Sequence, residues 1–255
     1  MEKLTIIKVG GKVVEEEASL HQLLKGFSQI EGHKLLVHGG GRSATKLAEK
    51  LGIESQMVNG RRITDAETLK VVTMVYGGLV NKNIVAGLQA LGVNALGLTG
   101  ADMNIMLSDK RPVKDIDYGY VGDVKKVNSP LLSSLIWQGI VPILAPLTHD
   151  GQGHILNTNA DTIAGEAAKA LASHFDVTLT FCFEKKGVLM DENDDDSVIR
   201  QITKADFEKL IANNIVQGGM IPKLENAFAA IDAGVKRVVI TEASELGKES
   251  GTVVC

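Results

Sequence analysis

The chain has 255 residues, of which 44% are hydrophobic, so it can bury a core large enough for one domain or for two lobes. Its formal net charge is -4, and acidic and basic residues are mixed along the chain, which argues against a nucleic-acid-binding surface. Two cysteines, Cys182 and Cys255, are too few for a disulfide framework, and no uninterrupted run of eighteen apolar residues could span a membrane. We therefore expect a cytoplasmic protein with no nucleic-acid or membrane partner.

Short apolar runs alternate with segments of helical periodicity along the chain. The runs predicted to be strands are Leu4–Val9, Lys34–Val37, Val93–Leu98, Ile140–Ala145, Val177–Phe183 and Val235–Ile240. The segments predicted to be helices are Glu15–Ile30, Ser43–Leu51, Ala66–Leu91, Asp161–Ala172, Ala205–Ala212 and Met220–Ala233. Because nearly continuous apolar strands are typical of burial on both faces, we expect a three-layer α/β/α sandwich around a mainly parallel open sheet.

Two segments, Gln56–Thr64 and Leu107–Asn128, break this alternation of strands and helices. Each contains alternating apolar residues punctuated by Gly, Asn or Asp, a pattern typical of β-hairpins that could cover a site beside the sheet. The nearest feature to a domain boundary is the stretch Ala172–His174. It predicts two lobes, residues 1–173 and 174–255, that share one sheet.

Lys8 stands alone in the first apolar run and is soon followed by Gly10 and Gly11. An ammonium buried in a strand is costly unless it meets an anion. The two glycines allow the backbone to approach a ligand and to offer its N–H groups. The pattern fits a phosphate site, and it also fits an edge-strand lysine that reaches water beside an ordinary turn.

Gly39, Gly40 and Gly41 follow the second strand and precede a helix, where backbone N–H groups and the helix dipole attract an anion. With Ala44 the triplet also matches the dinucleotide fingerprint G-x-G-x-x-A. However, no second strand ending in an acid follows at the distance which that fingerprint requires. A merely tight turn would not need three consecutive glycines.

Two further polar segments could contact a ligand. In the first, Asn59–Asp65, an arginine could bind a carboxylate through two parallel hydrogen bonds, or it could be solvated. In the second, Asn157–Asp161, helix capping accounts for one polar residue and leaves others for a ligand.

The segment 218–223 contains two glycines, a proline and Lys223 in the first turn of a helix, where the helix dipole disfavours a cation. This placement predicts a compensating anionic ligand. The acidic run Asp191–Asp196 has Asp196 and Ile202 where a calcium loop requires glycine and glutamate, so we interpret it as a solvated loop. The sequence contains no HExxH, G-x-S-x-G or G-x-x-x-x-G-K-[ST] motif, so dispersed lysines and glycine turns would have to hold any nucleotide.

Together these motifs resemble the amino acid kinase family over nearly the whole chain. The resemblance is carried by Lys8-Val-Gly10-Gly11, His38-Gly-Gly-Gly41, Asn59-Gly-Arg-Arg62-Ile-Thr-Asp65, Gly97-Leu-Thr-Gly100, Tyr118-Gly-Tyr-Val-Gly122-Asp-Val, Leu156-Asn157-Thr-Asn-Ala-Asp161 and Gly219-Met-Ile-Pro-Lys223. It implies phosphorylation of the γ-carboxylate of an N-acylated glutamate by ATP with Mg²⁺, in arginine biosynthesis. It further implies that residues 1–173 bind the acyl amino acid and form a dimer, and that residues 174–255 bind the nucleotide.

Matched to the family's motifs, the expected site residues fall into three groups. Lys8 and Lys223 would stabilise charge on the transferring phosphoryl group, and Asp161 would hold both lysines in place. The acyl amino acid would contact Gly40, Gly41, Asn157 and Arg62, the last through its α-carboxylate. The nucleotide would contact Gly10, Gly11, Glu184, Gly187 and Gly219, and no side chain is expected to bind a metal directly.

The chain departs from the family's usual pattern at several positions. Arg42 replaces a usual proline near the expected acyl pocket, so the acyl group could carry its own carboxylate, as in N-succinyl-L-glutamate; an Arg42 exposed on its helix is the alternative. Asp102-Met103 stands where Asp-Gly is usual, and Phe181–Gly187 replaces the usual Leu-Thr-Asp-Val segment, which leaves the adenine and ribose contacts open. Without the N-terminal helix of arginine-sensitive relatives, we expect a homodimer formed through Ala66–Leu91 and no arginine feedback.

Three other functions remain open at this point. Another kinase of the family could act on free glutamate, aspartate or carbamate, although a free amino acid brings an ammonium that needs an acidic partner. A non-catalytic sensor of an acyl amino acid or nucleotide would not need Lys8, Asp161 and Lys223 together. A dinucleotide oxidoreductase would rest on the glycine pattern alone.

Overall fold

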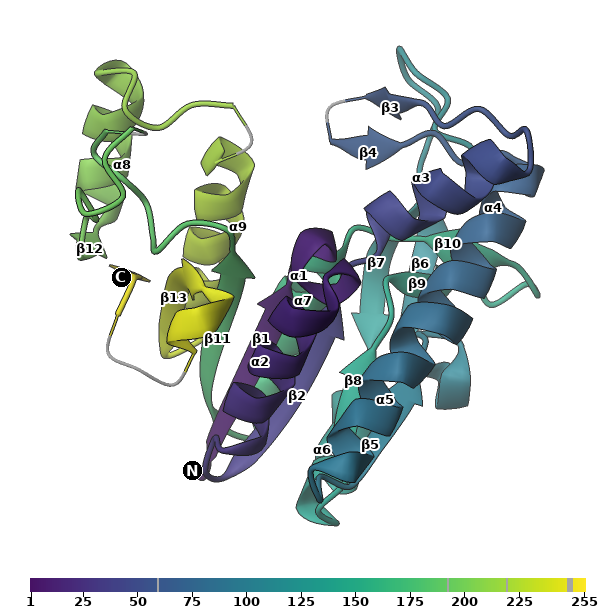
Figure 1. The fold of residues 1–255 in the computed structure, drawn as a ribbon, viewed down its shortest axis with the longest axis horizontal. Coiled ribbons are helices and arrows are strands. Elements are labelled where there is room, and N and C mark those ends of the chain that lie inside the picture. Colours follow the sequence, from purple (N-terminus) through teal and green to yellow (C-terminus); the bar gives the residue numbers. More distant parts are fainter. Residues whose placement is uncertain (59, 192, 219, 247–249) are drawn as a thin grey trace.

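The structure is a computed structural model that describes residues 1–58, 60–191, 193–218, 220–246 and 250–255. Its centre is an eight-stranded sheet in the order β12-β14-β13-β11-β1-β2-β8-β5 (Figure 1). The strands are β1 (Lys3–Val9), β2 (His33–His38), β5 (Ala95–Leu98), β8 (Val141–Leu144), β11 (Asp176–Phe183), β12 (Gln201–Ile202), β13 (Arg237–Glu242) and β14 (Thr252–Val254). Neighbouring strands run parallel except β13 and β14, so the prediction of a mainly parallel sheet is confirmed.

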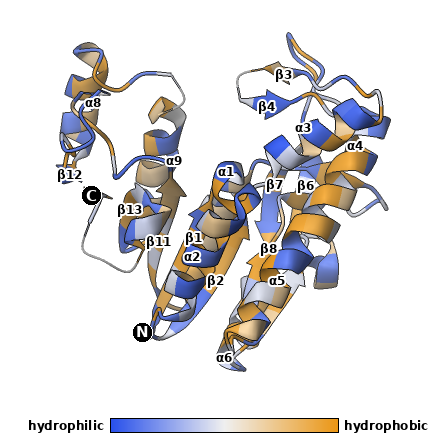
Figure 2. Cartoon of the chain, in the orientation of Figure 1, coloured by the Kyte–Doolittle hydropathy of each residue, from blue (hydrophilic) through white to orange (hydrophobic). Residues whose placement is uncertain are grey.

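The central strands are apolar because both faces of the sheet are covered, and Figure 2 shows them in the hydrophobic colour. In β1, Leu4 and Ile6 belong to one core cluster, whereas Ile7 and Val9 belong to another. Alternate side chains of a strand point to opposite faces, so the two clusters are the two interfaces between sheet and helices. The predicted three-layer arrangement is confirmed.

The helices divide between the two faces according to the core cluster that they join. One face is covered by α1 (Gly11–Glu15), α2 (Glu17–Ser28), α3 (Gly41–Lys50), α4 (Ala66–Val72), the π-helix η1 (Thr73–Val80) and α5 (Asn81–Ala90). The other face is covered by α6 (Ser129–Trp137), α7 (Ala160–Leu171), α8 (Lys204–Ala212) and α9 (Met220–Asp232). Two short 3-10 turns, η2 (Asp102–Asn104) and η3 (Ala243–Glu245), complete the helical elements among the described residues.

Both predicted hairpins are present beside the carboxyl ends of the central strands. The first pairs β3 (Met57–Val58) with β4 (Arg61–Arg62). The second pairs β6 (Met106–Lys110) with β7 (Gly122–Val127), in a four-stranded sheet with β9 (Leu147–His149) and β10 (Ile155–Asn157). The hairpins meet where Thr64 bridges to Gly119, whose φ is +69° and whose hypothetical Cβ would lie 2.2 Å from the Thr64 carbonyl oxygen. Glycine is therefore needed at that contact.

Helices α4, η1 and α5 run on from one another as one helical segment, Ala66–Ala90, which is long and apolar enough to cross a membrane by length and composition alone. This is weak evidence, because a core helix passes the same test, and Val71, Val75 and Ile84 of this segment are buried in the core. The expected boundary at residue 173 falls just before β11, and it stays a prediction.

Candidate functional site

Two neighbouring cavities open at the carboxyl ends of β1, β2 and β11, the edge at which parallel α/β sheets usually bind ligands. The first, called here the arginine cavity, has a volume of about 170 Å³ and is lined by Gly39, Gly40, Gly41, Arg61, Arg62, Tyr76 and Asn157, among others. The second, called the lysine cavity, has a volume of about 420 Å³ and is lined by Gly10, Gly11, Lys12, Gly41, Arg42, Phe183, Glu184, Gly187 and Lys223, among others. Gly41 lines both, so the two cavities meet at the start of α3.

Lys8 is buried near the end of β1, where its ammonium lies 2.8 Å from Asp161 Oδ1. Asp161 is in the first turn of α7, which Asn159 caps by accepting hydrogen bonds from the backbone N–H groups of Asp161 and Thr162. Since β1 pairs with β2 on one side and β11 on the other, the edge-strand interpretation of Lys8 is wrong. A buried cation at this position is stabilised by a carboxylate that a helix N-terminus holds in place.

The side chain of Lys223, on α9, lies near the ammonium group of Lys8. Its Nζ lies 3.8 Å from the centroid of the Phe183 ring, and Nζ of Lys8 lies 5.1 Å from that centroid. Burial lowers the pKa of Lys223, and the charge of Lys8 lowers it further, whereas Asp161 acts in the opposite direction. One carboxylate and one aromatic face therefore offset two ammonium groups, which is an arrangement ready to accept an anion.

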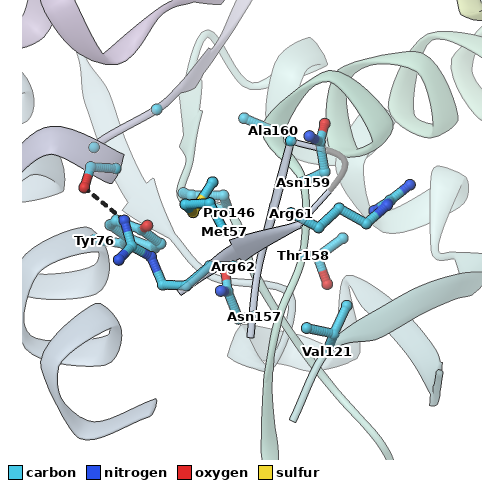
Figure 3. A pocket seen from close by; sticks show the side chains of 14 residues that line it. Met57, Arg61, Arg62, Tyr76, Val121, Pro146, Asn157, Thr158, Asn159 and Ala160 are labelled. Carbon is cyan, nitrogen blue, oxygen red and sulfur yellow. Dashed lines mark hydrogen bonds between the residues drawn. The ribbon is translucent and has the colours of Figure 1, made fainter. Parts of the chain in front are cut away.

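Arg62 forms the wall of the arginine cavity (Figure 3). Its Nη2 donates hydrogen bonds to the Gly41 carbonyl oxygen at 2.8 Å and to Thr45 Oγ1 at 2.9 Å. Its Nη1 is buried and has no hydrogen-bond partner within the described part of the chain. A buried guanidinium nitrogen without a partner is unusual, and it suits a carboxylate ligand in the cavity.

Tyr76 lies in the π-helix and packs against the glycine turn. A Cβ on Gly40 would lie 2.9 Å from Tyr76 Cδ1, so only glycine fits there without displacing the ring. Burial raises the pKa of Tyr76, which keeps the phenol neutral. A π-helical turn within a longer helix is often found at a functional site, and here it carries a cavity residue that the sequence interpretation missed.

Asn157 and Arg61 line the arginine cavity from other elements. Asn157, at the end of β10, donates a hydrogen bond from Nδ2 to Thr64 Oγ1 at 3.0 Å, which ties it to the first hairpin. The Arg61 side chain extends away from that of Arg62 in Figure 3, and its pKa is lowered by burial and by nearby Arg111. Arg61 thus adds a second, partly desolvated cation to this cavity.

Arg42 lines the lysine cavity, not the arginine cavity in which Arg62 and Asn157 lie. Its Nη2 is 3.4 Å from Glu184 Oε1, and Lys12 Nζ is 3.0 Å from Glu184 Oε2. Arg42 is therefore not beside Arg62 and Asn157, where a contact with the acyl group would place it. The Arg42 side chain is more than half exposed, as the alternative interpretation required.

His38 fixes the start of the glycine turn from beneath. Asn81 Nδ2 donates to His38 Nε2 at 3.1 Å, so the protonated Nδ1 of His38 donates to the Gly39 carbonyl oxygen at 2.7 Å. Burial lowers the pKa of His38 to about 4. The ring is therefore neutral near pH 7 and acts as a hydrogen-bonded spacer between α5 and the turn.

The remaining expected nucleotide residues also gather at the lysine cavity. Gly10, Gly11, Glu184 and Gly187 line it, and Gly219 lies outside the described residues, as does Asn59 of the first hairpin. A Cβ on Gly187 would lie 2.7 Å from Thr252 Oγ1, so this glycine permits a close approach of β14. Phe183 and Lys12 were not singled out in the sequence, where an aromatic at a strand end and a lysine after two glycines are weak signals.

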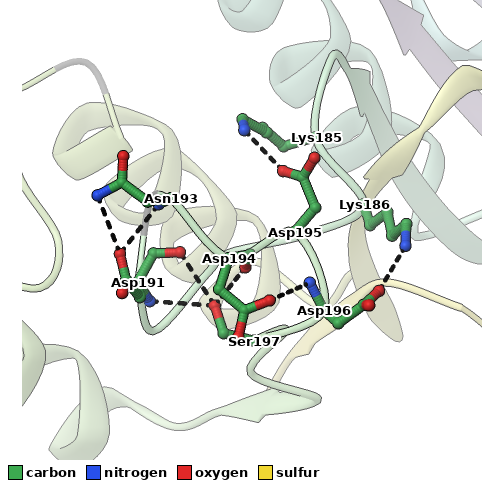
Figure 4. Close-up of polar contacts among 8 residues, drawn as sticks. All are labelled: Lys185, Lys186, Asp191, Asn193, Asp194, Asp195, Asp196 and Ser197. Carbon is green, nitrogen blue, oxygen red and sulfur yellow. Dashed lines mark hydrogen bonds and ion pairs between the residues drawn. The ribbon is translucent and has the colours of Figure 1, made fainter.

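The acidic loop after β11 pairs its carboxylates with lysines and with its own backbone (Figure 4). Asp195 lies 2.7 Å from Lys185 Nζ, and Asp196 lies 2.6 Å from Lys186 Nζ. Asp191 and Asp194 accept backbone hydrogen bonds from residues two positions further on. Among the described residues, no three His, Cys, Asp or Glu side chains are grouped so that they could hold a metal ion.

Residues 3–242 match the sequence model of the amino acid kinase family. A relative from Parabacteroides distasonis, named acetylglutamate kinase, is 77% identical over 254 residues, which cover 100% of both chains. The solved structure of smu.665 from Streptococcus mutans UA159 has a TM-score of 0.82 at 30% identity and covers 98% of each chain. N-acetylglutamate synthase from Neisseria gonorrhoeae, complexed with coenzyme A and N-acetyl-glutamate, shares the fold, with a TM-score of 0.84 at 20% identity over 99% of this chain and 59% of its own. The chain belongs to the amino acid kinase family.

Proposed function

We propose that the protein is an acetylglutamate kinase of arginine biosynthesis, which transfers the γ-phosphoryl group of ATP to the γ-carboxylate of N-acetyl-L-glutamate. The name of the relative at 77% identity supports this assignment. The structural observation that carries it is the junction at Gly41, where a cavity with a buried free arginine donor meets a cavity lined by Lys223, whose ammonium shares the Phe183 ring with that of Lys8. A bound carboxylate and a bound polyphosphate would meet at that junction.

The chemistry needs positioning and charge stabilisation more than proton transfer. A γ-carboxylate is already ionised near pH 7 and attacks phosphorus directly, so no general base is required. The ammonium groups of Lys8 and Lys223 stabilise the negative charge of the transferring phosphoryl group, and Asp161 keeps Lys8 in place. The product is an acyl phosphate with ADP, formed without a covalent enzyme intermediate.

The arginine cavity binds the acyl amino acid. Arg62 is already fixed through Nη2, so Nη1 is the donor that receives the α-carboxylate. Asn157 and the backbone of Gly40 hold the rest of the molecule, and Gly41 places the γ-carboxylate toward the lysine cavity.

The lysine cavity binds ATP, and its residues suit a polyphosphate because ammonium, guanidinium and backbone N–H groups are donors. Gly10, Gly11, Glu184, Gly187 and Gly219 are the nucleotide contacts that we propose. Mg²⁺ would enter with the nucleotide and neutralise part of the phosphate charge. The protein's own contribution is the pair of ammonium groups of Lys8 and Lys223.

N-Succinyl-L-glutamate is a second candidate substrate, and Arg61 is the observation that favours it. This guanidinium lines the arginine cavity, is partly desolvated, and makes no hydrogen bond or ion pair closer than 4 Å with the other described residues. A succinyl group would bring a carboxylate into the same cavity. Arg42, from which the sequence analysis inferred a succinyl group, lines the lysine cavity.

We further propose a cytoplasmic homodimer, with residues 1–173 as the acyl-amino-acid and dimer lobe and residues 174–255 as the nucleotide lobe. The segment Ala66–Ala90 exposes Met74 and Leu79, whose side chains are 53% and 57% accessible. An open apolar groove beside it is lined by Leu69, Met74 and Ile155, among others. Apolar groups exposed together along one helix are typical of a subunit interface.

The function is tested by measuring ADP release from Mg-ATP with N-acetyl-L-glutamate, N-succinyl-L-glutamate and free L-glutamate, with hydroxylamine present to trap the acyl phosphate. We expect a hydroxamate with an acylated substrate, and the faster of the two acylated compounds identifies the acyl group. Turnover of free glutamate alone would move the chain elsewhere in the family. Silence with all three would contradict the kinase assignment and favour a sensor.

A further inference from the structure

Glu184 lies between two cations at the mouth of the lysine cavity. Its Oε2 is 3.0 Å from Lys12 Nζ and its Oε1 is 3.4 Å from Arg42 Nη2. All three side chains line the cavity together with Lys223. The carboxylate thus uses both of its oxygens on groups that would otherwise face the cavity as free donors.

The two cations come from adjacent backbone turns. Lys12 is in the first turn of α1 and Arg42 is in the first turn of α3. A Cβ on Gly11 would lie 3.5 Å from the backbone nitrogens of both Gly40 and Gly41, so these two turns are in van der Waals contact. Two cations on turns that meet concentrate positive charge, and the dipole of α3 makes the position of Arg42 less favourable still.

Stability does not explain this arrangement. The side chains of Lys12, Glu184 and Arg42 are 41%, 49% and 58% accessible, and ion pairs this exposed contribute little to folding. Their common feature is the cavity of about 420 Å³ that they border, where Lys223 also lies. A carboxylate that bridges a guanidinium and an ammonium occupies the kind of site in which phosphate oxygens bind.

We propose that Glu184 is an internal anion that holds Lys12 and Arg42 in place until the phosphates of the nucleotide displace it, and that both cations then bind phosphate oxygens. This inference rests on the proposed use of ATP and changes the role expected of Glu184 from ligand contact to competitor. Because phosphate binding must break both ion pairs of Glu184, part of the binding free energy that the two cations provide is lost. Removing the carboxylate therefore tightens phosphate binding, and removing either cation weakens it.

Inorganic tripolyphosphate, measured by calorimetry without Mg²⁺, isolates these phosphate contacts from any base, ribose or metal contact. We expect Lys12→Gln and Arg42→Gln each to raise its dissociation constant about tenfold, the size of one lost charge-assisted hydrogen bond. We expect Glu184→Gln to lower the constant severalfold. A dissociation constant that falls when the carboxylate is removed, but rises when either cation is removed, is the result specific to this proposal.

Two variants control for net charge alone. Lys46→Gln removes one positive charge from α3, where Lys46 pairs with Glu15 outside the lysine cavity. Glu67→Gln removes one negative charge from α4, where Glu67 pairs with Lys70. Both should change tripolyphosphate affinity less than twofold.

Weaker or unchanged binding by Glu184→Gln would overturn the proposal, and so would unchanged binding by both cation variants or no binding by the unmodified protein. The ADP-release assay distinguishes failure of this inference from failure of the proposed function. A protein that binds tripolyphosphate with the expected pattern but does not turn over would retain the inference and lose the kinase assignment. All three substituted side chains are about half accessible, so their variants should fold, and a thermal unfolding curve checks this.

Discussion

Two side chains near the junction of the two cavities, Arg62 and Lys223, are suited to different parts of the proposed reaction. Arg62 is a donor held by the Gly41 turn with one nitrogen left for a ligand, whereas Lys223 is a cation that rests on an aromatic face. The rigid guanidinium is suited to hold a substrate that does not move. The flexible ammonium is suited to follow a phosphoryl group during transfer.

Lys223→Ala is expected to lower kcat by about 10²–10³-fold, as the loss of one donor to a developing charge does in other enzymes. The free energy of unfolding should change little, because the ammonium is partly exposed and its pKa is already lowered by burial. Steady-state kinetics and urea unfolding measure both. Lys204→Ala, which removes an exposed lysine paired with Asp232, is the matched control. A Lys223→Ala enzyme with unchanged kcat would remove Lys223 from the mechanism.

Arg62→Lys is expected to raise KM for the acyl amino acid about 10- to 100-fold, because an ammonium lacks the planar fork that lets one nitrogen hold the Gly41 turn while the other binds a carboxylate. The KM for ATP should stay within about twofold, since Arg62 does not line the lysine cavity. The comparison of the two KM values separates substrate recognition from a general loss of structure. An equal rise in both would show that Arg62 only supports the turn.

Strands and hairpins could be predicted where a single hydrophobicity pattern ran through the whole segment. All six predicted strands are present because each is apolar on both faces, and both hairpins are present because their turn residues interrupt an alternating pattern. Helix α6 was missed, although Asn128 caps it and Pro130 lies in its first turn. Strands β12 and β14 are two and three residues long, too short to show a periodicity.

Site residues could be predicted where a charged side chain is unusual for its position in a strand or helix. Lys8, Asp161 and Lys223 lie close to one another: Lys8 forms an ion pair with Asp161, and the charges of both act on the pKa of Lys223. The direction of Arg42 could not be predicted, since Gly41, the position before it in α3, lines both cavities whereas Arg42 lines only the lysine cavity. Phe183 was missed because its contribution depends on two distant lysines and not on its neighbours in sequence.

His38 couples the end of β2 to α5, and its titration should make this link sensitive to acid. Its folded pKa of about 4 lies below the ordinary 6.5, so between these values the unfolded chain binds a proton that the folded chain does not. The free energy of unfolding should therefore fall as pH drops from 6.5 to 4, by on the order of 3 kcal/mol.

Urea unfolding at several pH values measures this loss, with His38→Asn as the comparison. Asparagine does not titrate, and its amide can still donate toward the Gly39 carbonyl oxygen. The variant should be less stable at pH 7 but should lose less stability on acidification. A pH dependence as steep as that of the unmodified protein would assign the effect to other groups.

At the scale of the whole molecule, one sheet joins the two cavities and carries the long helix that we propose as the dimer interface. Met74→Glu combined with Leu79→Glu should convert the dimer to a monomer, because each subunit would bury two carboxylates at the interface. Sedimentation velocity measures the mass. Met190→Glu, at a similarly exposed methionine outside this segment, should leave the dimer intact. A dimer that persists in the double variant would place the interface elsewhere.

The central claim is that a carboxylate bound by Arg62 receives a phosphoryl group under the charge of Lys8 and Lys223. Phosphorus-31 NMR of the protein with Mg-ATP and N-acetyl-L-glutamate tests it most directly, because the method distinguishes acyl phosphate from inorganic phosphate as each forms. We predict that an acyl-phosphate signal grows as the ATP γ-phosphate signal declines, and that its initial rate falls about 10²–10³-fold in Lys8→Ala and in Lys223→Ala. Release of inorganic phosphate with no acyl phosphate at any time, or full acyl-phosphate formation by both lysine variants, would contradict the account.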